Sequence, residues 1–290
     1  MQKKFRPDEN DSHDEYISRF FIPMEYGFKS IDSIEAKAEF LNFFTQDLLK
    51  SARNEFIESI DLDNRQFDKI EKAIEYHVIG KIGQRRSQYK ALLNCISEYM
   101  DYRNVDYNYE YQHVNDKYKI ELKSLINYIE TARKINEKYL RLFIERTEPD
   151  SVSVDNSLTS ITFFRGIYNN SYYKSAINGS VYKNTSDFIS KYASTPEEEL
   201  EYQELRFITS YTFSMLVSHK FMITDFNARR AIISIPYELI EDRVLSSFLV
   251  SKYLDNNQYE FMCMPSLTQL YIKNIANTED FSIFEIRDQF

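Results

Sequence analysis

The sequence predicts an α+β protein, with a helical N-terminal domain over residues 1–150 and a small mixed β-sheet domain with flanking helices over residues 151–290. Two observations predict this division. Apolar residues recur at helical spacing in the first half, whereas the second half holds short β-prone apolar runs bounded by proline and polar turns. A polar segment containing one proline, residues 147–158, separates the two patterns and is the predicted linker.

Amphipathic helices account for the first half. Their apolar positions predict helices over residues 33–60, 66–78, 88–100 and 116–146. Polar residues from Asp61 to Asn64 separate the first two, and Gly80 and Gly83 separate the second from the third. Residues 101–115 are rich in Tyr, Asn and Asp and predict a loop or a weak hairpin.

Strands dominate the predicted second half. Apolar runs predict strands over residues 159–165, 231–235, 258–264, 267–275 and 281–286. Residues 197–219 predict a helix, because Pro196 suits its first turn and the acidic run that follows suits its positive end. A shorter helix is expected over residues 237–249.

Composition narrows the class of protein. The chain of 290 residues is 43% hydrophobic and 28% charged, which is enough to bury a core. The net charge of −9 argues against a general nucleic-acid binder. A hydrophilic start and the lack of an apolar run of about 18 residues predict a cytoplasmic protein without a membrane partner. Cys95 and Cys263 are expected as buried thiols, and the four histidines show no metal-ligand spacing, so no metal is expected.

The run from Ser160 to Tyr168 carries the first candidate site. It is a β-prone segment that ends in Arg165 and Gly166, in a chain with only five glycines. Glycine at a strand end permits a sharp turn or close approach of a ligand, and a fixed guanidinium binds phosphate or carboxylate. The alternative is an ordinary strand end with a surface arginine.

A second candidate lies in the strand predicted over residues 258–264. Gln258 and Glu260 are two residues apart, so on an extended strand they project from the same face. We expect Arg165 and Glu260 to meet in one cleft, where the arginine holds a pyrophosphate and the carboxylate stabilises a developing cation. The alternative is a strand with one solvated polar face.

Phe164-Arg165 and Gln258-Tyr259-Glu260 resemble the first and last motifs of the mono-ADP-ribosyltransferase family. The resemblance implies that Arg165 binds NAD, with Gly166 beside it, that Glu260 is catalytic and that Gln258 orients the acceptor. It also implies NAD as a substrate and a macromolecular acceptor, either protein or nucleic acid.

The family's middle motif, a Ser-Thr-Ser strand, has no clear counterpart before residues 231–235. The nearest segments are Ile208-Thr209-Ser210 and Met222-Ile223-Thr224-Asp225, and Thr224 is taken as a cofactor-binding residue. Phe164 and Tyr172 are expected to line the nicotinamide site.

Phe164-Arg165-Gly166 and the residues up to Tyr172 also resemble the opening of the FRG domain, a bacterial and phage-borne module. Together the two resemblances imply a toxin or a phage-defence effector of the abortive-infection type, with an antitoxin or a phage component as partner. It leaves open a non-catalytic sensing module.

Residues 78–86 resemble the Gly-x-x-Gly loop of the KH domain, in which Gly80 and Gly83 would let the backbone clamp RNA beside Arg85 and Arg86. RNA binding is therefore a further alternative function. The simpler interpretation is a glycine-broken connection between two helices.

Overall fold

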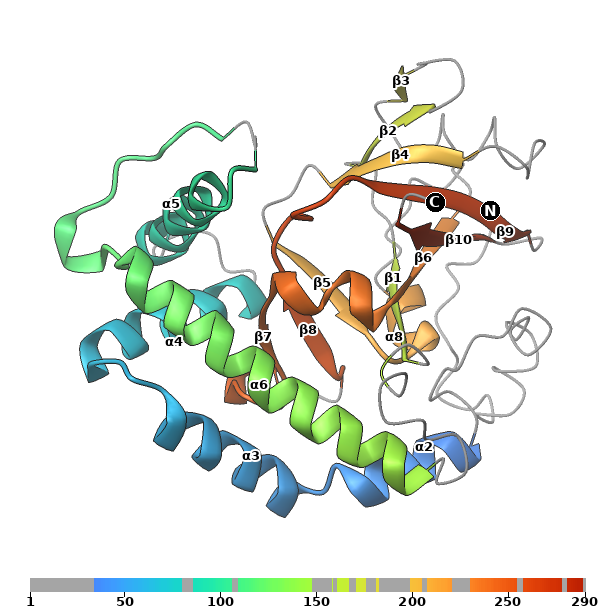
Figure 1. The fold of residues 1–290 in the computed structure, drawn as a ribbon, viewed down its shortest axis with the longest axis horizontal. Coiled ribbons are helices and arrows are strands. Elements are labelled where there is room, and N and C mark those ends of the chain that lie inside the picture. The colour runs from blue at the N-terminus through green and yellow to red at the C-terminus, as the bar shows by residue number, and fades with distance from the viewer. Residues whose placement is uncertain are drawn as a thin grey trace, which may run out of the picture.

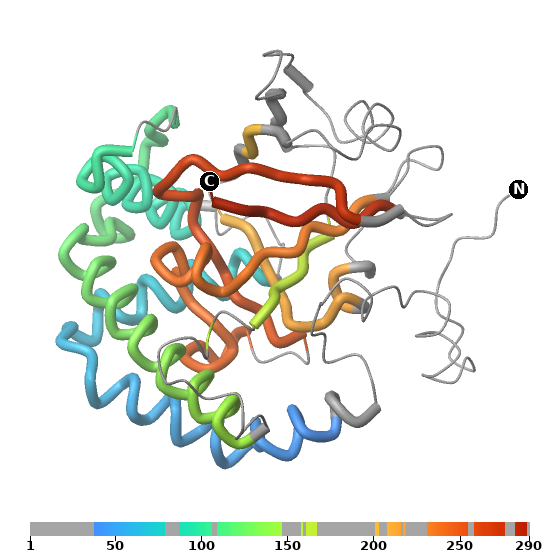
Figure 2. Tube along the Cα trace, turned by 45° about the vertical axis from the view of Figure 1, so that its right-hand side comes forward, coloured from blue at the N-terminus to red at the C-terminus, as the bar shows by residue number. Residues whose placement is uncertain are grey.

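The computed structural model describes residues 34–79, 86–105, 109–147, 158, 161–166, 171–175, 181–182, 199–204, 208–220, 230–254, 258–277 and 281–288. In this part of the chain a layer of N-terminal helices packs against a mixed β-sheet (Figure 1). Figure 2 shows the same helices curving around one side of the strands. The predicted α+β class is confirmed.

The helices follow the predicted apolar spacing, with shifted boundaries. They are α2 (Ile34–Phe43), α3 (Gln46–Ser59), α4 (Asn64–Ile79), α5 (Arg86–Tyr102) and α6 (Leu122–Thr147), with the 3-10 helix η2 (Asp116–Tyr118) before α6. The single helix expected over residues 33–60 is two helices. The break occurs because Thr45 caps α3: its backbone is extended, and its Oγ1 accepts a hydrogen bond from the Leu48 amide at 3.3 Å.

Ten strands form one sheet within the described residues, in the order β3-β2-β4-β9-β10-β6-β1-β5-β8-β7. They are β1 (Thr162–Gly166), β2 (Ser171–Ser175), β3 (Val181–Tyr182), β4 (Glu199–Glu204), β5 (Thr209–Thr212), β6 (Arg230–Pro236), β7 (Val244–Ser247), β8 (Glu260–Cys263), β9 (Leu270–Asn277) and β10 (Phe281–Arg287). β6 and β10 pair in parallel and their other neighbours are antiparallel, so the sheet is mixed as predicted but is not small.

The prediction of a helix over residues 197–219 is wrong. This segment forms β4 and β5, and only its end is helical, as α8 (Met215–Lys220). The acidic residues favour a helix locally, but β4 pairs with β2 on one side and β9 on the other. Tyr202 of β4 is buried while Glu201 is half-buried, so the strand period and long-range pairing override local propensity.

The prediction of a helix over residues 237–249 is also wrong. Its place is taken by two 3-10 turns, η4 (Tyr237–Leu239) and η5 (Glu241–Arg243), followed by β7. Every residue of β7 is buried, because β8 pairs with it and α6 packs on it. Periodicity alone does not separate such a fully buried strand from a buried helix.

One continuous cluster of buried residues joins the helices to the sheet. Phe40 of α2 lies 5.3 Å from Phe213 after β5, and Phe213 lies 6.2 Å from Phe248 after β7, measured between ring centroids. Phe164 and Ile232 are also buried but stand outside this cluster, and α8 packs against their strands. The predicted division into two domains near residue 150 stays a prediction.

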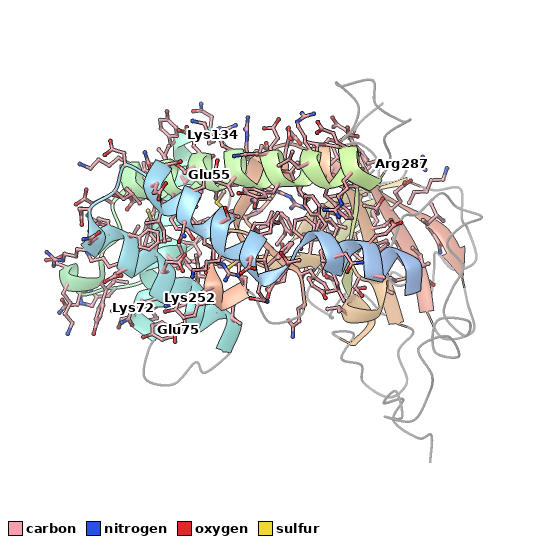
Figure 3. All side chains as sticks on the ribbon, turned by 90° about the horizontal axis from the view of Figure 1, so that it is seen from below. Glu55, Lys72, Glu75, Lys134, Lys252 and Arg287 are labelled. Carbon is pink, nitrogen blue, oxygen red and sulfur yellow. The ribbon has the colours of Figure 1, made fainter. Side chains whose placement is uncertain are left out.

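A buried polar network ties α4 to α6 and to the chain after β7. The Glu71 carboxyl of α4 accepts hydrogen bonds from the Tyr128 hydroxyl and, at 2.9 Å, from Ser251 Oγ. Burial raises the pKa of Glu71, while these two hydrogen bonds oppose that rise. The 3-10 helix η6 (Lys252–Leu254) packs on α4, and Figure 3 shows its Lys252 near Lys72 and Glu75 of α4.

Replacing Tyr128 with phenylalanine is expected to lower the free energy of unfolding by about 1–3 kcal/mol. The loss is larger at pH 9 than at pH 5, because the lost hydrogen bond stabilises the charged form of Glu71 and its removal raises the folded-state pKa further. Urea unfolding at the two pH values measures both effects.

Tyr139→Phe is the matched control for Tyr128→Phe. Tyr139 lies on the same helix and donates to Glu55 Oε2 at 3.1 Å, but Glu55 is only half-buried. Its removal is expected to cost less free energy of unfolding than the removal of the Tyr128 hydroxyl. An equal loss at both pH values for Tyr128→Phe would contradict the role assigned to its hydroxyl.

Candidate active site

The candidate site lies on strand β5 and on its two neighbours in the sheet, β1 and β8 (Figure 1). Phe164 of β1 pairs with Thr212 of β5, and Thr212 pairs with Glu260 of β8. Residues paired directly across strands project from the same face of a sheet. Phe164, Thr212 and Glu260 therefore form one row on one face.

Glu260 is the first residue of β8, and it is only 8% exposed. Ser210 Oγ donates a hydrogen bond to Glu260 Oε1 from the neighbouring strand β5. Burial raises the pKa of Glu260, and the hydrogen bond from Ser210 acts in the opposite direction. Ser210 itself is half-buried, so the pair lies at the margin between the core and the solvent.

Ser210 belongs to the site, although the sequence did not predict it there. Ile208-Thr209-Ser210 is one of the two segments nearest to a Ser-Thr-Ser strand, but the sequence predicts a helix over this part of the chain. The signal available in the sequence was the strand-like Thr209-Ser210-Tyr211-Thr212, in which Ser210 and Thr212 share a face. Both hydroxyls act at this site, since Thr212 Oγ1 donates to the Gln258 carbonyl at 2.5 Å.

Gln258 does not belong to the strand that carries Glu260. β8 begins at Glu260, and the intervening Tyr259 has a left-handed backbone with φ 51°. The prediction of an extended strand over residues 258–264, with Gln258 and Glu260 on one face by simple alternation, is therefore wrong. The reason is local: the Gln258 carbonyl bonds to the Thr212 hydroxyl rather than extending the ladder between β5 and β8.

Arg165 projects from the opposite face to Glu260. Because Phe164 aligns with Glu260, the next residue along β1 points to the other side of the sheet. There the Arg165 guanidinium lies 5.9 Å from the centre of the Tyr211 ring and is 9% exposed. The expected single cleft formed by Arg165 and Glu260 is not found in this geometry.

A second guanidinium shares the Tyr211 ring with Arg165. Arg243 of η5 is fully buried, lies 5.3 Å from the ring centre and donates from Nη2 to the Tyr211 hydroxyl at 3.0 Å. This cation–π layer packs η5 against β5 and β1. Arg165 thus forms part of the packed layer beneath the sheet.

The other predicted site residues lie in different places. Gly166 ends β1 opposite Ile232, and Phe164 is fully buried in the row that contains Glu260. Tyr172 lies in β2, which four strands separate from β1 in the sheet order, so pairing does not bring it beside Phe164. Thr224 lies outside the described residues, as does the loop from Gly80 to Arg85 predicted to bind RNA.

Replacing Ser210 with alanine is expected to raise the pKa of Glu260, because the lost hydrogen bond stabilises the carboxylate. Carboxyl carbon NMR of protein labelled at glutamate measures the titration, and Glu260→Gln assigns the resonance. Ser234→Ala is the matched control, since Ser234 is buried in β6 and donates to the Phe284 carbonyl at 3.2 Å. An unchanged titration in Ser210→Ala would contradict the assigned hydrogen bond.

Three further observations concern the described residues. Cys95 and Cys263 are free and buried, as predicted. Among the residues that the structure describes, no group of three or more His, Cys, Asp or Glu side chains is arranged to hold a metal ion. None of the described helices is both long and apolar enough to cross a bilayer.

Comparison with known proteins gives weak similarities. No family model matches the chain, and no curated protein matches it. Among solved structures, the Vis toxin, an ADP-ribosyltransferase from Vibrio splendidus, is 10% identical with a TM-score of 0.30, covering 91% of this chain and 89% of that one. ADP-ribosyltransferase Vis in complex with agmatine is also 10% identical, with a TM-score of 0.28 over 83% of this chain and 84% of that one. TM-scores this low carry no argument about the fold or activity of this chain.

Proposed function

We propose that this chain is an ADP-ribosyltransferase-like enzyme that cleaves NAD, with Glu260 as its catalytic residue and Ser210 as a positioning residue. The observation that carries the proposal is the buried Glu260 carboxyl, held by the Ser210 hydroxyl across β5 and β8. A carboxyl that is little exposed and fixed by a neighbouring strand is pre-organised to act on a charge that develops beside it.

The proposed reaction breaks the bond between the nicotinamide nitrogen and the ribose carbon of NAD. Nicotinamide leaves with the bonding electron pair, and positive charge develops on the ribose, where the ionised Glu260 carboxylate stabilises it. An acceptor nucleophile or water then bonds to the same ribose carbon and releases its proton to the solvent. Gln258, half-buried two residues before Glu260, is proposed to face the acceptor.

The residues proposed to bind NAD rest on the family resemblance. The proposed set is Arg165, Gly166, Phe164, Tyr172 and Thr224. These residues do not all lie on the same face of the sheet as Glu260. Phe164 stands in the row that contains Glu260, whereas Arg165 lies beneath the opposite face against Tyr211. For this reason the proposal depends on Glu260 and Ser210 and does not require Arg165 to touch the phosphates.

A second candidate function is a non-catalytic, FRG-type sensing module of a phage-defence system. The observation that favours it is the placement of Arg165 and Glu260 on opposite faces, since a binding module needs no convergence of the two. For the enzyme we propose a bacterial toxin or abortive-infection effector in the cytoplasm, with a macromolecular acceptor and an antitoxin as partners. For the sensing module the proposed partner is a phage component.

Incubation with NAD labelled in the nicotinamide ring separates the two candidates. The enzyme is expected to release free nicotinamide, faster when a protein or nucleic-acid extract supplies an acceptor, and Glu260→Gln is run in parallel. No release with any acceptor, together with equal toxicity of the wild type and Glu260→Gln on expression, would favour the sensing module.

A further inference from the structure

We infer that Phe40 of the helical layer is a positioning residue for the Glu260 site and that it acts through Tyr259. The inference rests on the proposed function and gives the helical half a part in it. Tyr259 stands between Gln258 and Glu260 and has φ 51°.

The left-handed backbone of Tyr259 needs support from its surroundings. A bulky residue other than glycine is strained in this region, by an amount that surrounding contacts must offset. The conformation also sets the direction of the chain as it enters β8 at Glu260. Whatever holds Tyr259 in place therefore also holds the Glu260 side chain in its orientation.

Contacts on the ring and on the backbone hold this turn. The Tyr259 ring lies 4.6 Å from Phe40 at 70° and 5.9 Å from Phe248 at 79°, both edge-to-face. On the backbone, Thr212 Oγ1 donates to the Gln258 carbonyl at 2.5 Å, and the Phe248 amide donates to the Glu260 carbonyl at 3.0 Å. Only Phe40 among these contacts comes from the N-terminal helices.

Phe40 touches the ends of both strands that carry the Ser210–Glu260 pair. It is fully buried on α2 and packs against Tyr259 just before β8 and against Phe213 just after β5. A shift of α2 therefore moves the two strand ends on which the hydrogen bond between Ser210 and Glu260 depends. This contact links the helical layer to the proposed catalytic carboxyl.

Phe43 provides a matched control on the same helix. It is also buried, and its ring lies 4.8 Å from Phe44 and 5.4 Å from Phe143, within the helical layer. Phe40→Leu and Phe43→Leu remove similar volumes from the same core. They differ in that Phe40 packs on rings beyond the helical layer, those of Tyr259, Phe213 and Phe248.

Steady-state NAD cleavage is expected to separate the two variants. Phe40→Leu lowers kcat about tenfold with KM within about twofold of the wild type, because the carboxyl is misplaced after substrate binds. Phe43→Leu keeps kcat within about twofold. Equal kcat values in the two variants would overturn the inference.

A double variant tests whether the effect passes through Tyr259. Glycine adopts a left-handed backbone without strain, so Tyr259→Gly removes the need for support by Phe40. In the Tyr259→Gly background, Phe40→Leu is expected to change kcat by less than about twofold. A full tenfold loss in that background would contradict the inferred route through Tyr259.

A readout without NAD keeps this inference separate from the proposed function. The chain has no tryptophan, so Tyr259→Trp introduces a single fluorescent reporter at the turn. Adding Phe40→Leu is expected to shift its emission to longer wavelength and to increase quenching by acrylamide, whereas adding Phe43→Leu leaves both unchanged. If Phe40→Leu and Phe43→Leu give equal emission spectra in this background, the contact between Phe40 and Tyr259 is refuted. If the spectra differ but no nicotinamide is released from NAD, only the enzymatic proposal is refuted.

Discussion

Glu260→Gln is expected to lower the rate of NAD cleavage by a factor of about 10² to 10³ while the protein stays folded. Glutamine keeps the size of the side chain and still accepts a hydrogen bond from Ser210, so the strand pairing of β5 and β8 is preserved. It removes the negative charge that stabilises the ribose cation. Because Glu260 is only 8% exposed, water does not replace that charge.

The pH dependence of the wild type provides an independent test of the same carboxyl. Cleavage requires the ionised form, and burial raises the pKa of Glu260 above its ordinary value of about 4.5. The rate is therefore expected to fall as the pH falls through this raised pKa, which places the acidic limb of the profile above pH 4.5. In Ser210→Ala the limb moves to higher pH.

Glu285→Gln is the control for the charge change. Glu285 is half-buried on β10 of the same sheet and forms an ion pair with Arg287. Its substitution is expected to leave the rate within about twofold of the wild type. Nicotinamide release by Glu260→Gln at the wild-type rate would remove the catalytic proposal.

The second large expected effect is the loss of folding stability when Phe248 is replaced. Phe248→Ala is expected to reduce the free energy of unfolding by about 3–5 kcal/mol, because it leaves a cavity where a fully packed ring stood. Phe248 follows β7 and lies 5.4 Å from Phe44 of the helical layer and 5.8 Å from Phe261 of β8. Its removal weakens the helices and the sheet together.

Urea unfolding followed by helical circular dichroism and by tyrosine fluorescence measures this effect. The two signals are expected to change in one coincident transition that moves to lower urea in Phe248→Ala. Leu142→Ala on α6 is the control, since Leu142 is 41% exposed and its removal is expected to cost about 0.5 kcal/mol or less. Two separate transitions in the wild type would instead support the predicted division into two domains.

The sequence alone determined those elements whose signal is local. The apolar spacing of residues 66–78 and 88–100 predicted α4 and α5, and the β-branched run over residues 231–235 predicted β6. Burial of Cys95 and Cys263 likewise followed from their apolar neighbours. These predictions succeed because each residue's preference and its burial in the fold agree.

Only the tertiary structure decided which candidate residues meet. The acidic segment 199–204 is a strand because β2 and β9 pair with it, against its local preference for helix. Glu260 meets Ser210 rather than Arg165, because the register of β1, β5 and β8 aligns Glu260 with Phe164. A shift of one residue in register exchanges the two faces of a strand, and register is set by pairing between distant segments, which no local pattern encodes.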